Sequence, residues 1–335
     1  MEISNEMKQE LLSELKLIFP NQLNYKIDNF QRLHGADTET FGFRFIIQEK
    51  TIELILRLYR GITDRAEKEF NTIHSLYNAG LSVPKTYLWR KKSKTITRSY
   101  LIMEKIPGVL LSDYLFQIKS EQEKLDYFRL FIQEMVNIHN SDWSNYFPET
   151  KSLDLDEDPY LYVTQEIKFP KKMINKFNVV ELKPLIEWLE KKKEKSEQLS
   201  LLHGDYHMNN VIITPERNLV VIDWANIRLG DFRHDLGFSI VATSSAGEDV
   251  TKSFTDLYHA ISGIKVKKIE YFMILSILHN LLRCYSTLTN PQITNETEMT
   301  KNMFMITYRN YTQYLVKLVH AVTGIQLPTL EKALT

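Results

Sequence analysis

The sequence has very little cysteine: a single residue, Cys284, in a chain of 335. One cysteine cannot close an intramolecular disulfide, and no Cys/His array with zinc-ligand spacing is present. These absences exclude a disulfide-stabilised scaffold and a structural zinc domain. They favour a reducing compartment, so we predict a cytoplasmic location.

An excess of charge of one sign is also lacking, because 42 lysines and arginines balance 42 aspartates and glutamates. This balance gives no global positive field, so neither nucleic acid nor an anionic membrane is expected as a partner. Long apolar runs are absent as well. The amino terminus MEISNEMKQELL is charged, and the most apolar stretch, 271–282, is interrupted by His279 and Asn280. We predict neither an export signal nor a membrane span.

The first hundred residues combine strand patterns with two amphipathic helices. Phe41, Phe43 and Phe45 alternate at period two, as in a half-buried strand, and a turn around Gly35 precedes them. The next apolar run, 51–59, predicts a buried strand that contains Arg57, which needs a partner of opposite charge. The expected helices are 4–17 and 63–78, and the further strands are 83–89 and 95–106.

Beyond residue 110 the pattern changes to long helical periodicities. Helices are predicted at 121–139, 180–198, 252–262, 266–288 and 299–322, interrupted by strands only at 201–203, 211–213 and 219–222. We therefore predict an α+β fold with a strand-rich lobe at 1–106 and a mainly helical lobe at 107–335. Residues 103–108 would connect the two lobes.

The stretch 201–238 carries the strongest chemical signal. Two short apolar runs flank a polar loop with Asp205 and Asn210, and the second run ends in Asp223. A carboxylate that accepts a hydroxyl proton, together with an amide and a second carboxylate on Mg²⁺, is what phosphoryl transfer requires. Asp205 and Asn210 alone would more often cap a turn, but the ordered set favours chemistry.

His203, Gly204, Asp205 and Asn210 form the spacing H-G-D-x-x-x-x-N, followed by the I-D-W of 222–224. This string resembles the aminoglycoside phosphotransferase and choline kinase-like family, whose order of parts is similar to that of protein kinases. The resemblance implies a bilobal kinase-like fold. It also implies Asp205 as catalytic base and Asn210 and Asp223 as Mg²⁺ ligands.

The same resemblance assigns further positions around the catalytic string. Gly230, Asp231 and Asp235 match the family's downstream G-D-x-x-x-D element, and Asp235 and His203 are expected to be structural. Met208 and Asn209 replace the frequent Pro-Gly, which leaves Asn209 as an alternative to Asn210. Histidines at positions 139, 203 and 207 are expected to hold backbone or core geometry rather than to transfer protons.

Upstream residues fit the nucleotide side of the family's site. Arg57 stands in the place of the strand cation that touches the phosphates, and Glu69 matches the helix glutamate that pairs with it. The M-E-K-I-P-G of 103–108 resembles the hinge, so the backbone groups of Glu104 and Ile106 would bind adenine.

The predicted phosphate loop at 33–41 reads LHGADTETF and supplies Gly35 and Thr38. Thr38 stands where the family often has Asn or Ser. Protein kinases place three glycines over the phosphates, and their absence here favours a small-molecule enzyme over a protein kinase.

The acceptor region is less recognisable. An acidic segment at 149–158 offers four candidate substrate residues, Asp154, Asp156, Glu157 and Asp158. These would attract a cation such as an amino sugar, or form a solvated loop. Residues 251–335 carry the opposite balance, with nine lysines and arginines against five acids.

The resemblance thus predicts an enzyme that moves the γ-phosphate of ATP or GTP, with Mg²⁺, to a hydroxyl of a small molecule. Aminoglycoside-like acceptors are favoured. The alternatives are a choline-, homoserine- or sugar-kinase-like enzyme, and a non-catalytic kinase-like binding protein. The sequence leaves the acceptor, the nucleotide preference and the oligomeric state open.

Overall fold

Alternating apolar residues build the sheet that follows the first helix of the chain. A computed structural model describes residues 3–20, 22, 24–33, 38–142, 155–289 and 298–334. Within these ranges the chain divides into two units, Met1–Lys119 with Asn209–Ala225, and Ser120–Met208 with Asn226–Thr335. Residues 209–225 thus belong to the first unit, although they lie far along the chain. The lobes expected at 1–106 and 107–335 stay a prediction.

The first unit contains a five-stranded sheet in the order β1-β2-β3-β5-β4, with neighbouring strands antiparallel. Its strands are β1 (Tyr25–Leu33), β2 (Glu39–Ile47), β3 (Lys50–Leu58), β4 (Thr86–Arg90) and β5 (Tyr100–Glu104). The predicted Phe41, Phe43 and Phe45 point into its core, and each is at most 4% exposed. The turn expected around Gly35 lies outside the described residues.

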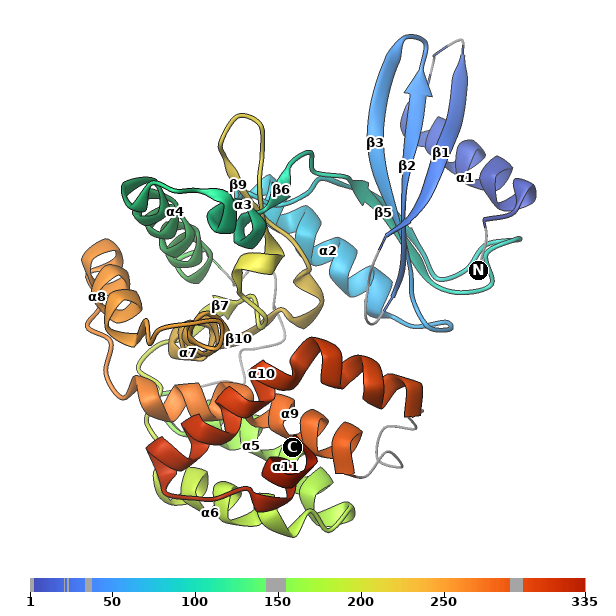
Figure 1. Ribbon diagram of the computed structural model, residues 1–335. Coiled ribbons are helices and arrows are strands. Elements are labelled where there is room, and N and C mark those ends of the chain that lie inside the picture. Colours follow the sequence, from blue (N-terminus) through green and yellow to red (C-terminus); the bar gives the residue numbers. More distant parts are fainter. Residues whose placement is uncertain are drawn as a thin grey trace. The chain divides into compact units, whose positions relative to one another are not determined.

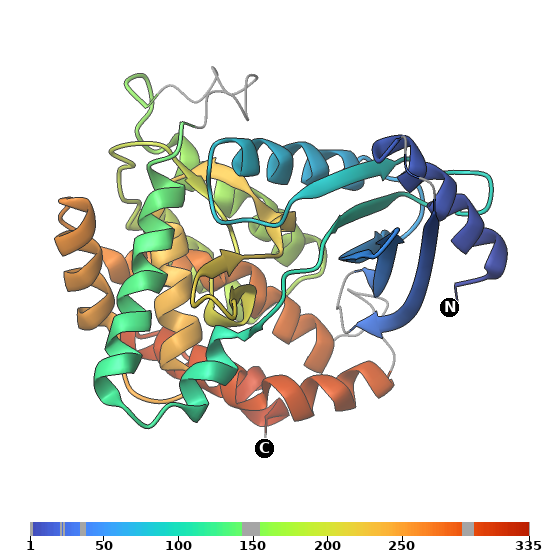
Figure 2. The same cartoon turned by 90° about the horizontal axis from the view of Figure 1, so that it is seen from above.

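Helices cover this sheet. Leu11 and Leu15 of α1 (Asn5–Ile18) join the same apolar core as the three phenylalanines, and Figures 1 and 2 show α1 in dark blue alongside the strands. The helix α2 (Arg65–Asn78) packs against β4 and β5. The unit also holds the short α3 (Leu111–Gln117) and a small sheet β6-β8-β9, with β6 at Val109–Leu110, β8 at Val211–Ile213 and β9 at Leu219–Val221.

The second unit is mainly helical. Its helices are α4 (Glu121–His139), α5 (Leu161–Lys176), α6 (Lys183–Lys191), α7 (Phe232–Ser244), α8 (Thr251–Ser262), α9 (Ile269–Thr289), α10 (Glu298–Thr323) and α11 (Pro328–Ala333). One two-stranded sheet pairs β7 (Ser200–Leu202) with β10 (Arg228–Gly230). The predicted α+β class is confirmed. None of the described helices is both long and apolar enough to cross a bilayer.

Several sequence-based expectations need correction. Strands β6 and β10 were not predicted, because two or three residues are too few to show a period. The expected helix 180–198 is a 3₁₀ turn at Val180–Leu182 followed by α6, which ends at Lys191. Helix α7 was missed because eleven of its thirteen residues are buried, so no polar face marks its period. Helix α5 was missed because Pro170 lies inside it.

Candidate active site

In the first unit Arg57 on β3 pairs with Glu69 on α2. The Arg57 side chain is 13% exposed and that of Glu69 is 2% exposed, and Arg57 Nη1 donates to Glu69 Oε1. The predicted strand-to-helix ion pair is therefore present and buried. A buried arginine requires such a partner, because an unpaired charge is costly in a low-dielectric interior.

Tyr59 completes this pair and was missed by sequence reasoning. Its hydroxyl donates to Glu69 Oε2, so both carboxylate oxygens of Glu69 are occupied. Burial raises the pKa of Tyr59 far above its ordinary value, and the charge of Glu69 acts in the same direction, so the phenol remains a donor. The available signal was its position two residues after Arg57, which places both side chains on one face of an extended chain.

The guanidinium of Arg57 also reaches two other predicted residues. Its Nη2 lies 2.6 Å from Asp223 Oδ1, and its Nε donates to Thr38 Oγ1 at 3.1 Å. Burial alone would lower the pKa of Arg57, but the charges of Glu69 and Asp223 outweigh burial and raise it. Arg57 is thus permanently cationic and bridges three oxygen-bearing groups.

Asn210 and Asp223 are held near each other by the hairpin of β8 and β9. The N–H of Ile222 donates to the carbonyl of Asn210 at 2.9 Å, directly after the pairing of Val211 with Val221. Asp223 has a left-handed φ of +65°, and its side chain is 40% exposed. Aspartate tolerates this conformation better than most residues.

The side chains that precede this hairpin differ in exposure. Asn210 is 8% exposed, whereas Asn209 is an exposed residue. Both belong to the same unit as Asp223. The choice between them as a metal ligand stays a prediction.

The predicted hinge follows β5. The N–H of Glu104 donates to the carbonyl of Lys85 at 2.8 Å, so Glu104 has only its carbonyl left for a base. Within the described part of the chain, the N–H of Ile106 has no hydrogen-bond partner. The N–H of Ile106 is thus a backbone donor at the hinge. Gly35, the other predicted nucleotide contact, lies outside the described residues.

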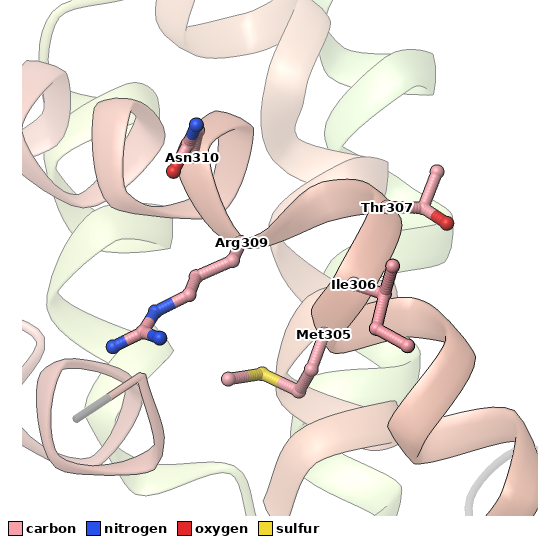
Figure 3. Close-up of a pocket in the computed structure, with 5 residues that line it drawn as sticks. All are labelled: Met305, Ile306, Thr307, Arg309 and Asn310. Atoms are coloured by element: carbon pink, nitrogen blue, oxygen red, sulfur yellow. The ribbon is translucent and has the colours of Figure 1, made fainter.

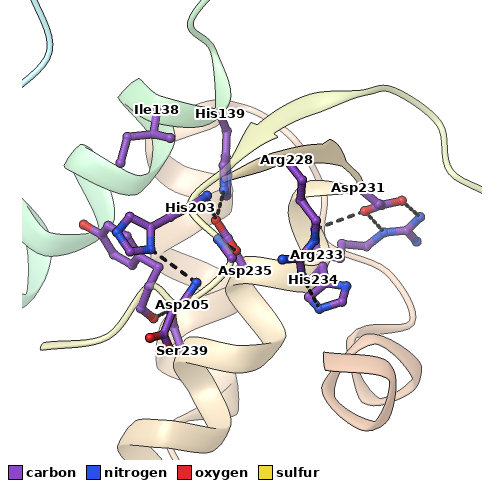
Figure 4. A network of polar contacts seen from close by, with 12 residues as sticks. Ile138, His139, His203, Asp205, Arg228, Asp231, Arg233, His234, Asp235 and Ser239 are labelled. Atoms are coloured by element: carbon purple, nitrogen blue, oxygen red, sulfur yellow. Dashed lines mark hydrogen bonds and ion pairs between the residues drawn. The ribbon is translucent and has the colours of Figure 1, made fainter. Parts of the chain in front are cut away.

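In the second unit Asp235 on α7 holds the backbone of the catalytic string (Figure 4). Its Oδ2 accepts the N–H of His203 at 2.6 Å, and its Oδ1 accepts the N–H of Gly204 at 2.9 Å. Burial alone would raise the pKa of this 1%-exposed carboxyl, but the hydrogen bond and charge of His139, with His203 and Arg228, lower it to about 2. Asp235 is therefore ionised and holds the backbone at His203 and Gly204.

The loop is fixed at further points. His139 Nδ1 lies 2.9 Å from the hydroxyl of Tyr258, and its Nε2 lies 3.5 Å from Asp235 Oδ2. His139 is buried and hydrogen-bonded, as expected. Tyr206 donates its hydroxyl to the carbonyl of Phe131, and Ser239 donates to the carbonyl of Tyr206.

Asp205 itself is partly open to solvent. Its side chain is 30% exposed, and its backbone N–H donates to His203 Nδ1 at 3.2 Å. His203 therefore carries its ring proton on Nε2 when neutral. Gly204 before it has a φ of +80°, and a Cβ there would lie 2.3 Å from the carbonyl oxygen of Asn226. Only glycine fits this position.

A second buried cluster lies beside Gly204 and was not foreseen. Arg228 Nη2 donates to His234 Nε2 at 3.0 Å, and the other ring nitrogen of His234 lies 2.8 Å from the hydroxyl of Tyr162. Arg228 Nε lies 3.5 Å from Glu166 Oε1. Burial lowers the pKa of His234 well below its ordinary value, and the charge of Arg228 adds to this effect. His234 is thus neutral, which lets Nε2 accept from Arg228.

The proposed acceptor acids are only partly described. Asp154 lies outside the described residues. Asp156 and Glu157 are exposed, and Asp158 is half-buried and accepts the N–H of Tyr160 at 2.9 Å, just before α5. Asp158 therefore closes a turn just before that helix.

A surface pocket of about 380 Å³ lies on α10 (Figure 3). Its described lining residues are Met305, Ile306, Thr307, Arg309 and Asn310. None of them is among the residues predicted from the sequence for nucleotide, metal or acceptor.

Comparisons with known proteins are consistent with these parts. Residues 33–264 match the model of the phosphotransferase enzyme family. Acyl-CoA dehydrogenase family member 10 of Mus musculus is 25% identical over 219 residues, which are 62% of this chain and 20% of that protein. The human family member 11 is 21% identical over 51% of this chain and 22% of its own length. This chain thus spans about a fifth of the curated relatives it matches.

Solved structures show the same fold. A candidate aminoglycoside phosphotransferase of Ralstonia eutropha superimposes with a TM-score of 0.69 at 17% identity, covering 92% of this chain and 98% of that one. A spectinomycin phosphotransferase in complex with ADP and spectinomycin has a TM-score of 0.60 at 15% identity, with 94% and 98% covered. An ethanolamine kinase of Plasmodium vivax has a TM-score of 0.55 at 15% identity, with 91% and 83% covered.

Proposed function

Because the chain belongs to the phosphotransferase enzyme family, we propose that it is a kinase-type enzyme that uses Mg²⁺-bound ATP or GTP to phosphorylate a hydroxyl of aminoglycoside-like acceptors. The observation that carries this proposal is the buried Arg57, which joins Glu69 to Asp223 in the first unit. A structural ion pair would need only one carboxylate. The second carboxylate, that of Asp223, has a 40% exposed side chain and is therefore accessible to a ligand.

On the nucleotide side, the chain's own groups divide into base and phosphate contacts. The carbonyl of Glu104 would accept from the exocyclic amine of adenine, and the N–H of Ile106 would donate to a ring nitrogen. Arg57 would direct its guanidinium at the phosphates while Glu69 and Tyr59 fix its orientation. Gly35 and Thr38 would cover the phosphates.

The residues present fit a magnesium ion. Carboxylate and amide oxygens are ligands that Mg²⁺ accepts, and it is usually bound by one or two protein groups together with phosphates and water. The side chain of Asp223 is 40% exposed, and the hairpin holds Asn210 beside it. Among the described residues, no group of three or more His, Cys, Asp or Glu side chains is placed to hold a metal ion. The phosphates of the nucleotide and water would supply the remaining ligands. When bound, the ion would neutralise charge that develops on the phosphates.

On the acceptor side, Asp205 would orient the substrate hydroxyl and accept its proton as the new O–P bond forms. Its 30% exposure leaves the carboxylate accessible. Asp235 accepts the backbone N–H groups of the two residues before Asp205, and His203 accepts the backbone N–H of Asp205 itself. Only four residues separate the proposed base, Asp205, from the proposed metal ligand Asn210 in the sequence.

The preference for aminoglycosides rests on charge. Asp156 and Glu157 are exposed and would attract a cationic acceptor over the Debye length of about 8 Å at physiological salt. Two of the structural neighbours are described as aminoglycoside or spectinomycin phosphotransferases. An ethanolamine kinase has the same fold, and ethanolamine is also a cation, which makes amino alcohols the second class to examine.

A phosphate-transfer screen tests this proposal. Purified protein is incubated with labelled Mg²⁺-ATP or Mg²⁺-GTP and a panel of amino sugars, amino alcohols, neutral sugars and nucleosides, with Asp205→Asn as the matched control. Transfer to amino sugars that requires Asp205 supports the proposal. Transfer to neutral compounds alone would reject the cationic acceptor, and no Asp205-dependent transfer to any compound would reject the enzyme mechanism.

A further inference from the structure

His207 lies against the proposed base, and the mechanism above gives it no task. Its Nε2 is 3.5 Å from Asp205 Oδ1, and the two side chains are 23% and 30% exposed. The His207 ring also contacts the ring of Phe238 on α7, with centroids 6.0 Å apart. Both residues belong to the second unit, so the contact lies within one part of the chain.

An aspartate base needs orientation as well as charge. The terminal torsion of aspartate is broad and roughly twofold, so a partly exposed carboxylate can turn either oxygen toward a substrate. The anchors already described hold the Asp205 backbone, through its N–H to His203 and through Asp235 on the two preceding residues. The contact with His207, by contrast, involves a carboxylate oxygen of Asp205.

The distance between His207 Nε2 and Asp205 Oδ1 suits a contact that shortens when the substrate binds. An N–H···O distance of 3.5 Å is longer than an ordinary hydrogen bond. Catalytic hydrogen bonds are often long in free enzymes and shorten when the substrate is bound. Neutral histidine with Nε2–H and protonated histidine both donate at this atom, so the contact needs no particular charge on His207.

We propose that His207 is a positioning residue that donates its Nε2–H to Oδ1 of Asp205 and thereby presents Oδ2 to the acceptor hydroxyl. The inference rests on the proposed role of Asp205 as base. In the transfer step the hydroxyl proton passes to Oδ2, the acceptor oxygen bonds to the γ-phosphorus, and the bond to the nucleoside diphosphate breaks. His207 keeps its proton throughout.

Two substitutions separate donation from packing. His207→Gln keeps an N–H donor at a similar reach, whereas His207→Phe keeps a ring against Phe238 but has no donor. With Mg²⁺-ATP and the best compound of the panel, or water as acceptor, we expect His207→Phe to lower kcat by about 10- to 100-fold. The KM for ATP should stay within about twofold, and His207→Gln should recover most of the loss.

The dependence on Asp205 is tested by a double-mutant cycle. In an Asp205→Ala background, His207→Phe should cause no further loss, because there is no carboxylate left to orient. Equal losses in the Gln and Phe variants would overturn the proposal, and so would a full His207→Phe loss that persists without Asp205. Melting temperatures of all variants show whether folding is intact.

A spectroscopic measurement addresses the contact without any acceptor. In protein with ¹⁵N-labelled histidine, the Nε2 resonance of His207 should carry a proton and should shift in Asp205→Ala, while exposed His259 on α8 should not change. An unchanged His207 resonance would overturn the inference. If the wild-type protein shows no Asp205-dependent turnover, the proposed function fails instead, and this shift alone decides whether Asp205 is the partner of His207.

Discussion

Arg57 and Glu69 offer a perturbation whose size can be worked from the structure. Removing one member of a buried ion pair costs about 3–5 kcal/mol, because the partner is left as an uncompensated charge. The two single changes are not equivalent. Glu69→Ala leaves Arg57 with Asp223 and Thr38, whereas Arg57→Ala leaves a 2%-exposed carboxylate with only the hydroxyl of Tyr59.

Arg57→Ala should therefore be the more destabilising of the two. In the double variant neither charge is stranded, so its cost should fall short of the sum of the single costs by about 1–3 kcal/mol. The same logic applies to nucleotide binding, where each single change should raise the nucleotide KM and the double change should add little more.

Urea unfolding monitored by tryptophan fluorescence measures the cycle, and nucleotide KM values measured on the same four proteins report on binding. Arg44 and Asp28 provide the matched control, because they form a 2.9 Å pair between β2 and β1 with side chains 42% and 23% exposed. Removal of that pair should cost less than about 1 kcal/mol. Additive costs for Arg57 and Glu69, within about 0.5 kcal/mol, would refute the buried pair as a unit.

Three other changes have defined outcomes. Asp223→Ala should abolish the Mg²⁺-dependent part of the rise in melting temperature with ATP, and a full Mg²⁺-dependent rise would contradict the metal assignment. Gly204→Ala should destabilise the protein by about 2 kcal/mol or more, because its Cβ would lie 2.3 Å from a carbonyl oxygen at a φ of +80°, and an unchanged melting temperature would refute this steric argument. Because the folded pKa of Asp235 is lowered from 3.8 to about 2, its ionised form contributes about 2 kcal/mol above pH 4, and this contribution disappears as the pH falls from about 4 to 2. The stability gap between wild type and Asp235→Asn should thus narrow over that interval, and a gap that stays constant would count against the lowered pKa.

Local periodicity and motif order were enough to predict much of the first unit. The alternating phenylalanines of β2 and the helical spacing of α2 depend on residues within one turn or one strand, so a single sequence displays them. The pairing of Arg57 with Glu69 followed from a charge in a buried strand and the family's order of parts. The order of the motif residues between His203 and Asp235 likewise singled out Asp205, Asn210 and Asp223 before any contact was known.

Contacts between residues far apart in the sequence could not be predicted from local patterns. Arg57 and Asp223 are 166 residues apart, and nothing local marks Asp223 as a partner of that arginine. The cluster of Arg228, His234, Tyr162 and Glu166 joins β10, α7 and α5, and two of those elements lacked a periodic signal. Such clusters depend on packing between elements, which a one-dimensional pattern does not encode.

Exposure separates the groups proposed to touch ligands from those that hold them in place. The side chains of Glu69 and Asp235 are 2% and 1% exposed, and both oxygens of each carboxylate accept hydrogen bonds from protein groups. The side chains of Asp223 and Asp205 are 40% and 30% exposed; one oxygen of Asp223 lies near Arg57, and one oxygen of Asp205 lies near His207. A saturated buried carboxylate can take neither a metal nor a proton without losing a partner, whereas a half-exposed one can. The chain therefore pairs one buried acid with one accessible acid in each unit: Glu69 orients Arg57 next to Asp223, and Asp235 fixes the backbone that carries Asp205.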